Sequence, residues 1–170
     1  MAILAACVST GCGKRKLHWS GARASQIKAS GFVVPIPASW RDGAESDDED
    51  LHQVLATLPG AHGLVKEDFD GATIIVKTGP SQPEAAASPP CEEIAQTIAK
   101  QESAKAEHVE KATIDGDGTC KWIYKKEDIE AHYWMRFHGD QVLAIMCFPQ
   151  NNAANLATCE QTIAAAHLEK

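Results

Sequence analysis

The second half of the chain carries apolar and polar positions in runs of seven or eight residues, the pattern of β-strands that bury one face more deeply than the other. Two such runs, residues 131–137 and 141–148, flank His138-Gly139-Asp140, and this arrangement predicts a hairpin. Residues 142–148 are apolar on both faces, so we expect a central strand there. The chain then changes to helical periodicity, with one apolar stripe formed by Leu156, Cys159, Ile163 and Ala166.

Shorter apolar runs predict the remaining elements. We expect strands at 31–37, 63–67, 72–78, 108–114 and 119–125, and helices at 51–58 and 89–104. A Pro- and Ala-rich loop at 79–90 precedes the longer helix, with Ser88 as its N-cap. Together these elements predict an α+β fold, in which two main helices pack on an antiparallel sheet of about six or seven strands.

The composition fits one globular domain. The chain has 170 residues, of which 44% are apolar and 23% charged. Its formal net charge of −7 argues against a nucleic-acid partner. No run approaches the roughly 18 to 20 consecutive apolar residues that a spanning helix needs. We therefore expect no membrane crossing by these residues themselves.

The six cysteines form two groups. Four lie in the body of the chain and permit three pairings; we favour Cys147 with Cys159 and Cys91 with Cys120, because each pair would join a helix to a strand. Each link would contribute about 3 kcal/mol by loop entropy, and both helices would lie on one side of the sheet. No Cys-x-x-Cys spacing occurs, which argues against a structural zinc site.

The first residues resemble the end of a bacterial lipoprotein signal. Leu4-Ala5-Ala6-Cys7 is similar to a lipobox, and Cys12 follows a poorer match. We interpret residues 1–12 as a signal remnant, with Cys7 or Cys12 lipidated, residues 13–30 as a flexible tether, and residues 31–170 as one domain. This predicts a lipid-anchored protein of the bacterial cell envelope. The alternative is a cytosolic protein whose N-terminal cysteines are ordinary thiols.

One strand face carries the only regular row of candidate ligand-binding side chains, formed by His132, Trp134, Arg136 and His138. Two imidazoles and a guanidinium could bind an anion or a metal ion, although such a row is more often the wetter face of a sheet. No nucleophile elbow, P-loop or dinucleotide motif is present. We therefore predict no enzyme activity, no cofactor and no bound metal.

The segment Gly31 to Trp40 (GFVVPIPASW), the strand VLAIMC ending at Cys147 and the helix through Ile163 resemble the PsbP-like fold, which includes DcrB-type bacterial lipoproteins. The likeness covers residues 31–170 and is one of pattern. It implies an α/β sandwich that is usually non-catalytic and acts as an assembly or accessory factor. We thus expect a binding module for an unknown protein or glycan; the alternative is a small metal- or anion-binding protein or enzyme that uses His132, Arg136 and His138.

Overall fold

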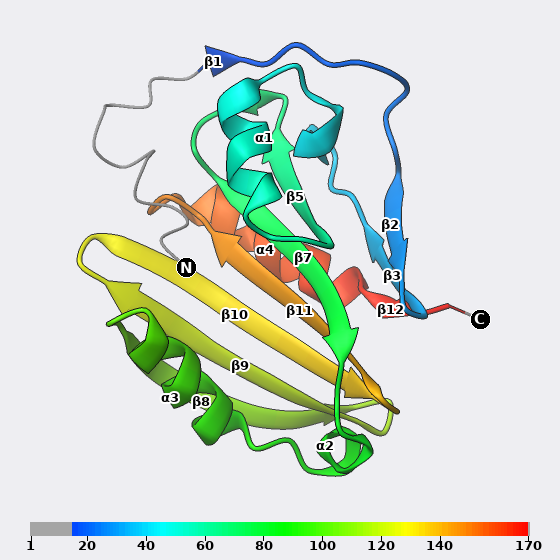
Figure 1. Ribbon diagram of the computed structural model, residues 1–170, viewed down its shortest axis with the longest axis vertical. Coiled ribbons are helices and arrows are strands. Elements are labelled where there is room, and N and C mark those ends of the chain that lie inside the picture. Colours follow the sequence, from blue (N-terminus) through cyan, green and yellow to red (C-terminus); the bar gives the residue numbers. More distant parts are fainter. Residues whose placement is uncertain (1–14, 170) are drawn as a thin grey trace.

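The computed structural model describes residues 15–169 and is built around a seven-stranded antiparallel sheet (Figure 1). Its strands, in spatial order, are β4 (Trp40–Asp42), β5 (Ala61–Lys66), β7 (Thr73–Pro80), β11 (Gln141–Phe148), β10 (Ile129–His138), β9 (Asp117–Lys126) and β8 (Lys105–Ile114). The predicted hairpin is β10–β11, and β11 pairs with β7 on its other side. The apolar strand is therefore central, as predicted.

Two smaller sheets and four helices complete the described part of the chain. The three-stranded sheet has the order β12 (His167–Leu168), β3 (Phe32–Pro35) and β2 (Gln26–Ala29), and the two-stranded sheet joins β1 (Arg15–Lys16) to β6 (Asp68–Phe69). The helices are α1 (Glu49–Ala56), α2 (Pro83–Ala87), α3 (Cys91–Gln101) and α4 (Ala153–Ala165), with a 3-10 turn η1 (Gly43–Glu45). The predicted α+β class is confirmed.

The helices α3 and α4 cover opposite faces of the large sheet. In Figure 1, α3 lies in front of β8 and β9, whereas α4 passes behind β7 and β11. The alternation along β10 gives the reason: Met135 and Phe137 pack with Cys91 of α3, whereas Trp134 packs with Cys159 of α4. The expectation that both helices lie on one side of the sheet is wrong, because residues on both faces of β10 are buried.

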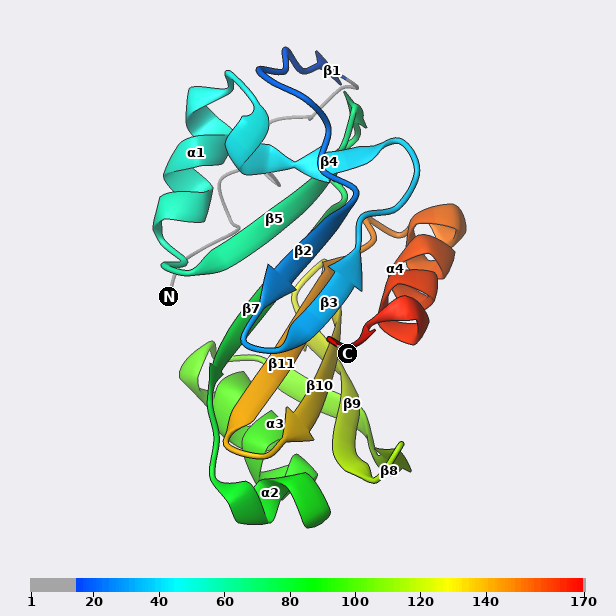
Figure 2. The same cartoon turned by 90° about the vertical axis from the view of Figure 1, so that its right-hand side faces the viewer.

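The three-stranded sheet lies beside α4 on the same face of the large sheet (Figure 2). Ile27 of β2 is 5% exposed and belongs to the same apolar cluster as Trp134, and Leu17 is also buried, against α1. The prediction of a flexible tether over 13–30 is therefore wrong for residues 15–30. The segment is mostly polar and was therefore predicted to be flexible, but its apolar side chains Leu17 and Ile27 pack against the domain.

The N-cap of α3 differs from the predicted one, and the structure also identifies the N-cap of α4. Helix α3 begins at Cys91 with Pro90 at the N-cap, two residues after the predicted cap at Ser88, because the short helix α2 occupies the segment expected to be a loop. Helix α4 begins after Asn152, whose side-chain oxygen accepts hydrogen bonds from two backbone N–H groups of the first turn. The predicted boundaries therefore hold to within a few residues.

One of the two predicted disulfides is present. Cys91 at the start of α3 is bonded to Cys120 of β9, with an S–S distance of 2.06 Å. Cys147 and Cys159 do face each other between β11 and α4, as predicted, but they are free thiols. The prediction of a disulfide between Cys147 and Cys159 is therefore wrong. Both are almost completely buried in the apolar cluster beneath α4, where a thiol packs as a small hydrophobic group.

We expect Cys147 and Cys159 to be unreactive towards N-ethylmaleimide in the folded protein. Burial raises the pKa of the Cys147 thiol, and its contact with Cys159 raises it further, so the reactive thiolate is scarce. Peptide mass spectrometry after labelling in buffer and in denaturant checks this, with both cysteines labelled only in denaturant. Rapid labelling in buffer, or a disulfide-linked peptide containing both residues, would contradict it.

Candidate functional site

The strand β10 carries all four side chains of the predicted ligand face, but they do not form one site. His132, Trp134, Arg136 and His138 do share one face of the strand, and only the side chain of His138 is well exposed. Trp134 lies in the main apolar cluster with Leu143 and Cys159. This buried indole separates His132 from the other two polar residues, so the face is not the wet surface that alternation suggested.

His132 lies near the start of β10, away from Arg136. Its Nε2 lies 3.0 Å from Oε1 of Glu130, and Glu130 also forms an ion pair with Lys125. Four residues along a strand span roughly 13 Å. A ligand held by His132 and Arg136 together would have to bridge that distance across Trp134.

Arg136 and His138 meet at a carboxylate that the sequence analysis did not select. Nε of Arg136 donates to Oδ2 of Asp117 at 2.7 Å, and Nδ1 of His138 lies 2.8 Å from Oδ1 of the same residue. Asp117 is 6% exposed, so both oxygens of a buried carboxylate are engaged. Burial of this charge costs free energy, which is offset only because its partners are held around it.

The sequence analysis did not select Asp117, which lies just outside the strand predicted at 119–125. Asp117 is the first residue of β9, and the β9–β10 register pairs its neighbour Gly118 with Phe137. That register places the carboxylate between Arg136 and His138. A search for opposite charges between β10 and the strand before it, rather than within the predicted hairpin, would have found the pair, since cross-strand neighbours interact in this way.

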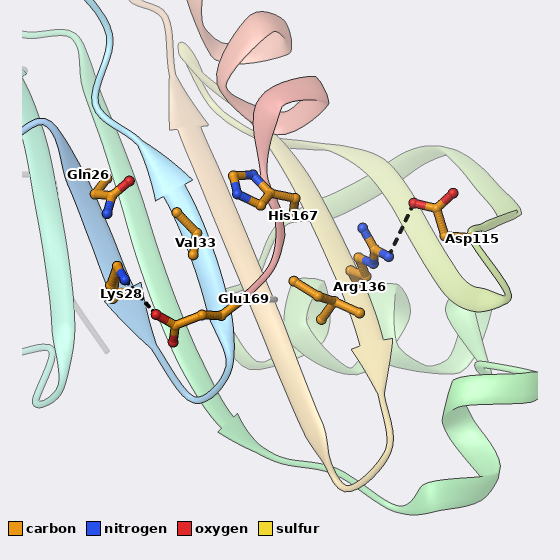
Figure 3. Close-up of a pocket in the computed structure, with 8 residues that line it drawn as sticks. Gln26, Lys28, Val33, Asp115, Arg136, His167 and Glu169 are labelled. Atoms are coloured by element: carbon orange, nitrogen blue, oxygen red, sulfur yellow. Dashed lines mark hydrogen bonds and ion pairs between the residues drawn. The ribbon is translucent and has the colours of Figure 1, made fainter.

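The same Arg136 borders a groove of about 810 Å³. The groove lies between the three-stranded sheet and the lower end of the large sheet, and Figure 3 shows the side chains around it. Its eight lining residues are Gln26, Lys28, Val33, Asp115, Arg136, His167, Leu168 and Glu169. They come from β2, β3, the β8–β9 turn, β10, β12 and the residue after β12, so residues from both ends of the described chain form its walls.

Two ion pairs stand at the borders of the groove. Lys28 pairs with Glu169 on one side. On the other side, Nη2 of Arg136 lies 3.6 Å from Oδ2 of Asp115, whose side chain is 81% exposed. Val33 supplies a buried apolar surface between the pairs. Charges of both signs at fixed positions around an apolar patch suit the binding of a polar partner segment.

The groove offers no hydroxyl or thiol nucleophile among its eight lining residues. Across residues 15–169, no three His, Cys, Asp or Glu side chains are grouped so that they could hold a metal ion. The side chains around this surface can form hydrogen bonds and ion pairs with a bound molecule.

The predicted lipidation sites, Cys7 and Cys12, lie outside the described residues. A search of the described helices found none with the length and apolar character needed to span a bilayer.

Comparison with known proteins gives a likeness in fold. No family model and no curated protein sequence matches this chain. The solution structure of cyanobacterial PsbP (CyanoP) from Synechocystis sp. PCC 6803 is similar, with a TM-score of 0.60 over 94% of this chain and 96% of that chain, at 10% sequence identity. A crystal structure from Bacteroides thetaiotaomicron VPI-5482 has a TM-score of 0.45 and 14% identity over 88% of this chain and 50% of that chain. The likeness to cyanobacterial PsbP shows that the chain has a PsbP-like fold.

Proposed function

We propose that this PsbP-like domain is a non-catalytic binding or accessory module of the bacterial cell envelope, held at a membrane by a lipid on Cys7 or Cys12. The observation that carries the binding role is the groove of about 810 Å³, whose walls present charged side chains of both signs. The lipobox-like sequence and the pattern likeness to DcrB-type lipoproteins support the anchored location. The partner is a protein or a glycan.

A partner surface explains why the charges of the groove are paired rather than clustered by sign. Lys28 with Glu169 and Arg136 with Asp115 give both a positive and a negative group on each side. Such a pattern gives little non-specific attraction but strong dependence on the order of charges in the partner. A substrate pocket would additionally need a reacting group, and none of the eight lining residues is an activated nucleophile.

The alternative is a small anion-binding protein, and one observation favours it. Arg136 is held in place by Asp117 and reaches the groove with its other guanidinium nitrogens. His132 does not contribute, because it is bound to Glu130 on the far side of Trp134. This alternative and the partner-binding role use the same surface, and they differ in whether the anion is free or part of a larger molecule.

Site-specific photo-crosslinking in the source organism tests the partner role. We expect a benzophenone amino acid at Gln26, in the groove, to yield an adduct of one defined mass. The same group at Glu93, exposed on α3 across the sheet, is the matched control and should not yield that adduct. Identical products from both positions, or none from Gln26, would refute partner binding at the groove.

Intact-mass analysis tests the anchor. We expect the protein purified from membranes of the source organism to carry a diacylglyceryl group on Cys7 or Cys12. Serine substitutions at these two positions, made singly, should identify the modified residue and release the protein from the membrane fraction. A mass that shows two unmodified N-terminal thiols would contradict the lipoprotein assignment.

A further inference from the structure

We propose that the groove contains a carboxylate-binding site centred on the guanidinium of Arg136, and that its occupant is an acidic side chain or the C-terminal carboxylate of a partner polypeptide. This rests on the proposed function, because it assigns a chemistry to the same partner surface. Of the two partners proposed, a protein and a glycan, the carboxylate-binding site favours the protein.

Arg136 is a charged side chain that is almost fully buried yet reaches an open groove. The residue is 3% exposed, and its Nε donates to Asp117 at 2.7 Å. Among its contacts within residues 15–169, the Nη nitrogens make one ion pair, with Asp115 at 3.6 Å, which is longer than a hydrogen bond. The outer edge of the guanidinium thus has donor capacity that the described residues leave unused.

The orientation of this guanidinium is fixed before any ligand arrives. Oδ2 of Asp117 accepts a hydrogen bond from Nε of Arg136, and Oδ1 of Asp117 lies 2.8 Å from Nδ1 of His138. A planar guanidinium held in this way offers two parallel N–H donors to a carboxylate without losing further side-chain freedom. Preorganisation of this kind lowers the entropic cost of binding.

Asp115 occupies the place of the ligand only loosely. Its side chain is 81% exposed, and it stands on the β8–β9 turn with a φ of +53°. An ion pair of this length whose acid is exposed contributes little, and Arg136 can exchange Asp115 for a better acceptor. The residue acts as a weak internal competitor for Arg136.

The rest of the groove favours a polypeptide carboxylate over phosphate or sugar. Asp115, Asp117 and Glu169 lie around the site, so a doubly charged phosphate meets more repulsion than a singly charged carboxylate. Gln26 offers a side-chain amide suited to a peptide backbone, and Val33 offers an apolar surface. No Phe, Tyr or Trp ring, on which a sugar would stack, is among the eight lining residues.

Nuclear magnetic resonance titration of the full chain tests the site through the Nε–Hε signal of Arg136 and the amide signals of Val33 and Leu168. The probes are acetyl-Ala-Glu-Ala-amide for a side-chain carboxylate and acetyl-Ala-Ala-Ala with a free C-terminus for a chain end. The neutral acetyl-Ala-Gln-Ala-amide and inorganic phosphate complete the set. We expect saturable shifts at these residues with at least one carboxylate peptide, weaker shifts with phosphate, and none with the neutral peptide.

Three variants make the assignment specific. Asp115→Asn should strengthen peptide binding about two- to fivefold by removing the internal competitor, and asparagine tolerates the positive φ of the turn. Arg136→Lys should weaken it by at least about tenfold, since the paired donors are lost. Lys125→Gln is the matched control: it removes one positive charge from the same face of the sheet outside the groove, and should leave the affinity unchanged.

Equal binding of the glutamine peptide, tighter binding of phosphate than of both carboxylates, or unchanged affinity in Asp115→Asn would each overturn the proposal. The Asp115→Asn result does not depend on tolerance of a buried substitution, because the side chain is exposed. Failure here, with a specific adduct still formed from Gln26, would refute the carboxylate site alone. Loss of both results would refute the groove as a partner surface.

Discussion

Replacing Arg136 with methionine is expected to lower the free energy of unfolding by about 3 to 5 kcal/mol, because Asp117 would be left buried without its charged partner. The carboxylate is 6% exposed, and its bond from Nε of Arg136 is 2.7 Å long. His138 remains beside the other oxygen, but it is a weaker partner because its charge depends on protonation. Urea denaturation followed by tryptophan fluorescence measures the change.

Two further variants separate the loss of the pair from the loss of packing. The double variant Arg136→Met with Asp117→Leu removes both charges, and should be more stable than Arg136→Met alone. Lys125→Met removes an exposed positive charge from the neighbouring strand and should leave stability nearly unchanged. A loss below about 1 kcal/mol in Arg136→Met would show that Asp117 is not a buried, dependent charge in solution.

Removing the Cys91–Cys120 disulfide is expected to cost about 3 to 4 kcal/mol of unfolding free energy, as estimated from the entropy of closing the loop. The two residues are 29 positions apart, and the bond fixes the start of α3 to β9. The variant Cys91→Ala with Cys120→Ala loses this restraint on the unfolded chain. Urea denaturation of the variant and of the oxidised wild-type protein gives the difference.

A reducing agent provides the matched control for the disulfide. Dithiothreitol should destabilise the wild-type protein by a similar amount and leave the double alanine variant unchanged, since Cys147 and Cys159 are already thiols. Further destabilisation of the variant by dithiothreitol would mean that these two residues form a second disulfide. Equal stability of oxidised and reduced wild type would contradict the stabilising role of the Cys91–Cys120 bond.

The disulfide and Arg136 lie on opposite faces of the sheet, so their loss should affect peptide binding differently. The disulfide lies under α3 on one face, whereas Arg136 projects from the other face towards the groove. Reduction should therefore lower stability without weakening the binding of carboxylate peptides under folding conditions. Arg136 variants should affect both properties, because one side chain supports Asp117 and lines the groove.

The α+β class, the central strand β11 and the terminal helix could be predicted from the sequence because they depend on local patterns; the PsbP-like fold came from a resemblance to that family. Alternation along 131–137 and 141–148 defines strands wherever they lie, and helical spacing after Asn152 defines α4. The disulfide from Cys91 to Cys120 was also within reach, since a helix start and a buried strand position were both evident. The strands and the helix require no knowledge of distant neighbours, whereas the disulfide does, since it joins residues 29 positions apart.

The site was decided by tertiary structure. The alternation placed His132, Arg136 and His138 on one face, but only the β9–β10 register places Asp117 between the last two. The packing of α4 buries Trp134 and thereby divides the row. Strand pattern specifies which residues share a face, while the elements packed on that face determine which of them meet solvent.

The groove could not be predicted from the sequence, because its walls come from segments far apart along the chain. Its walls join β2, which the sequence suggested to be part of a tether, with β12 after the last helix. Two- and four-residue strands carry too little periodicity to be recognised alone, and they form here because β3 pairs with both. The sequence by itself determined the strands and helices of the large sheet, since local periodicity specifies them; the folded chain alone decided the carboxylate site, since pairing between its two ends creates the groove.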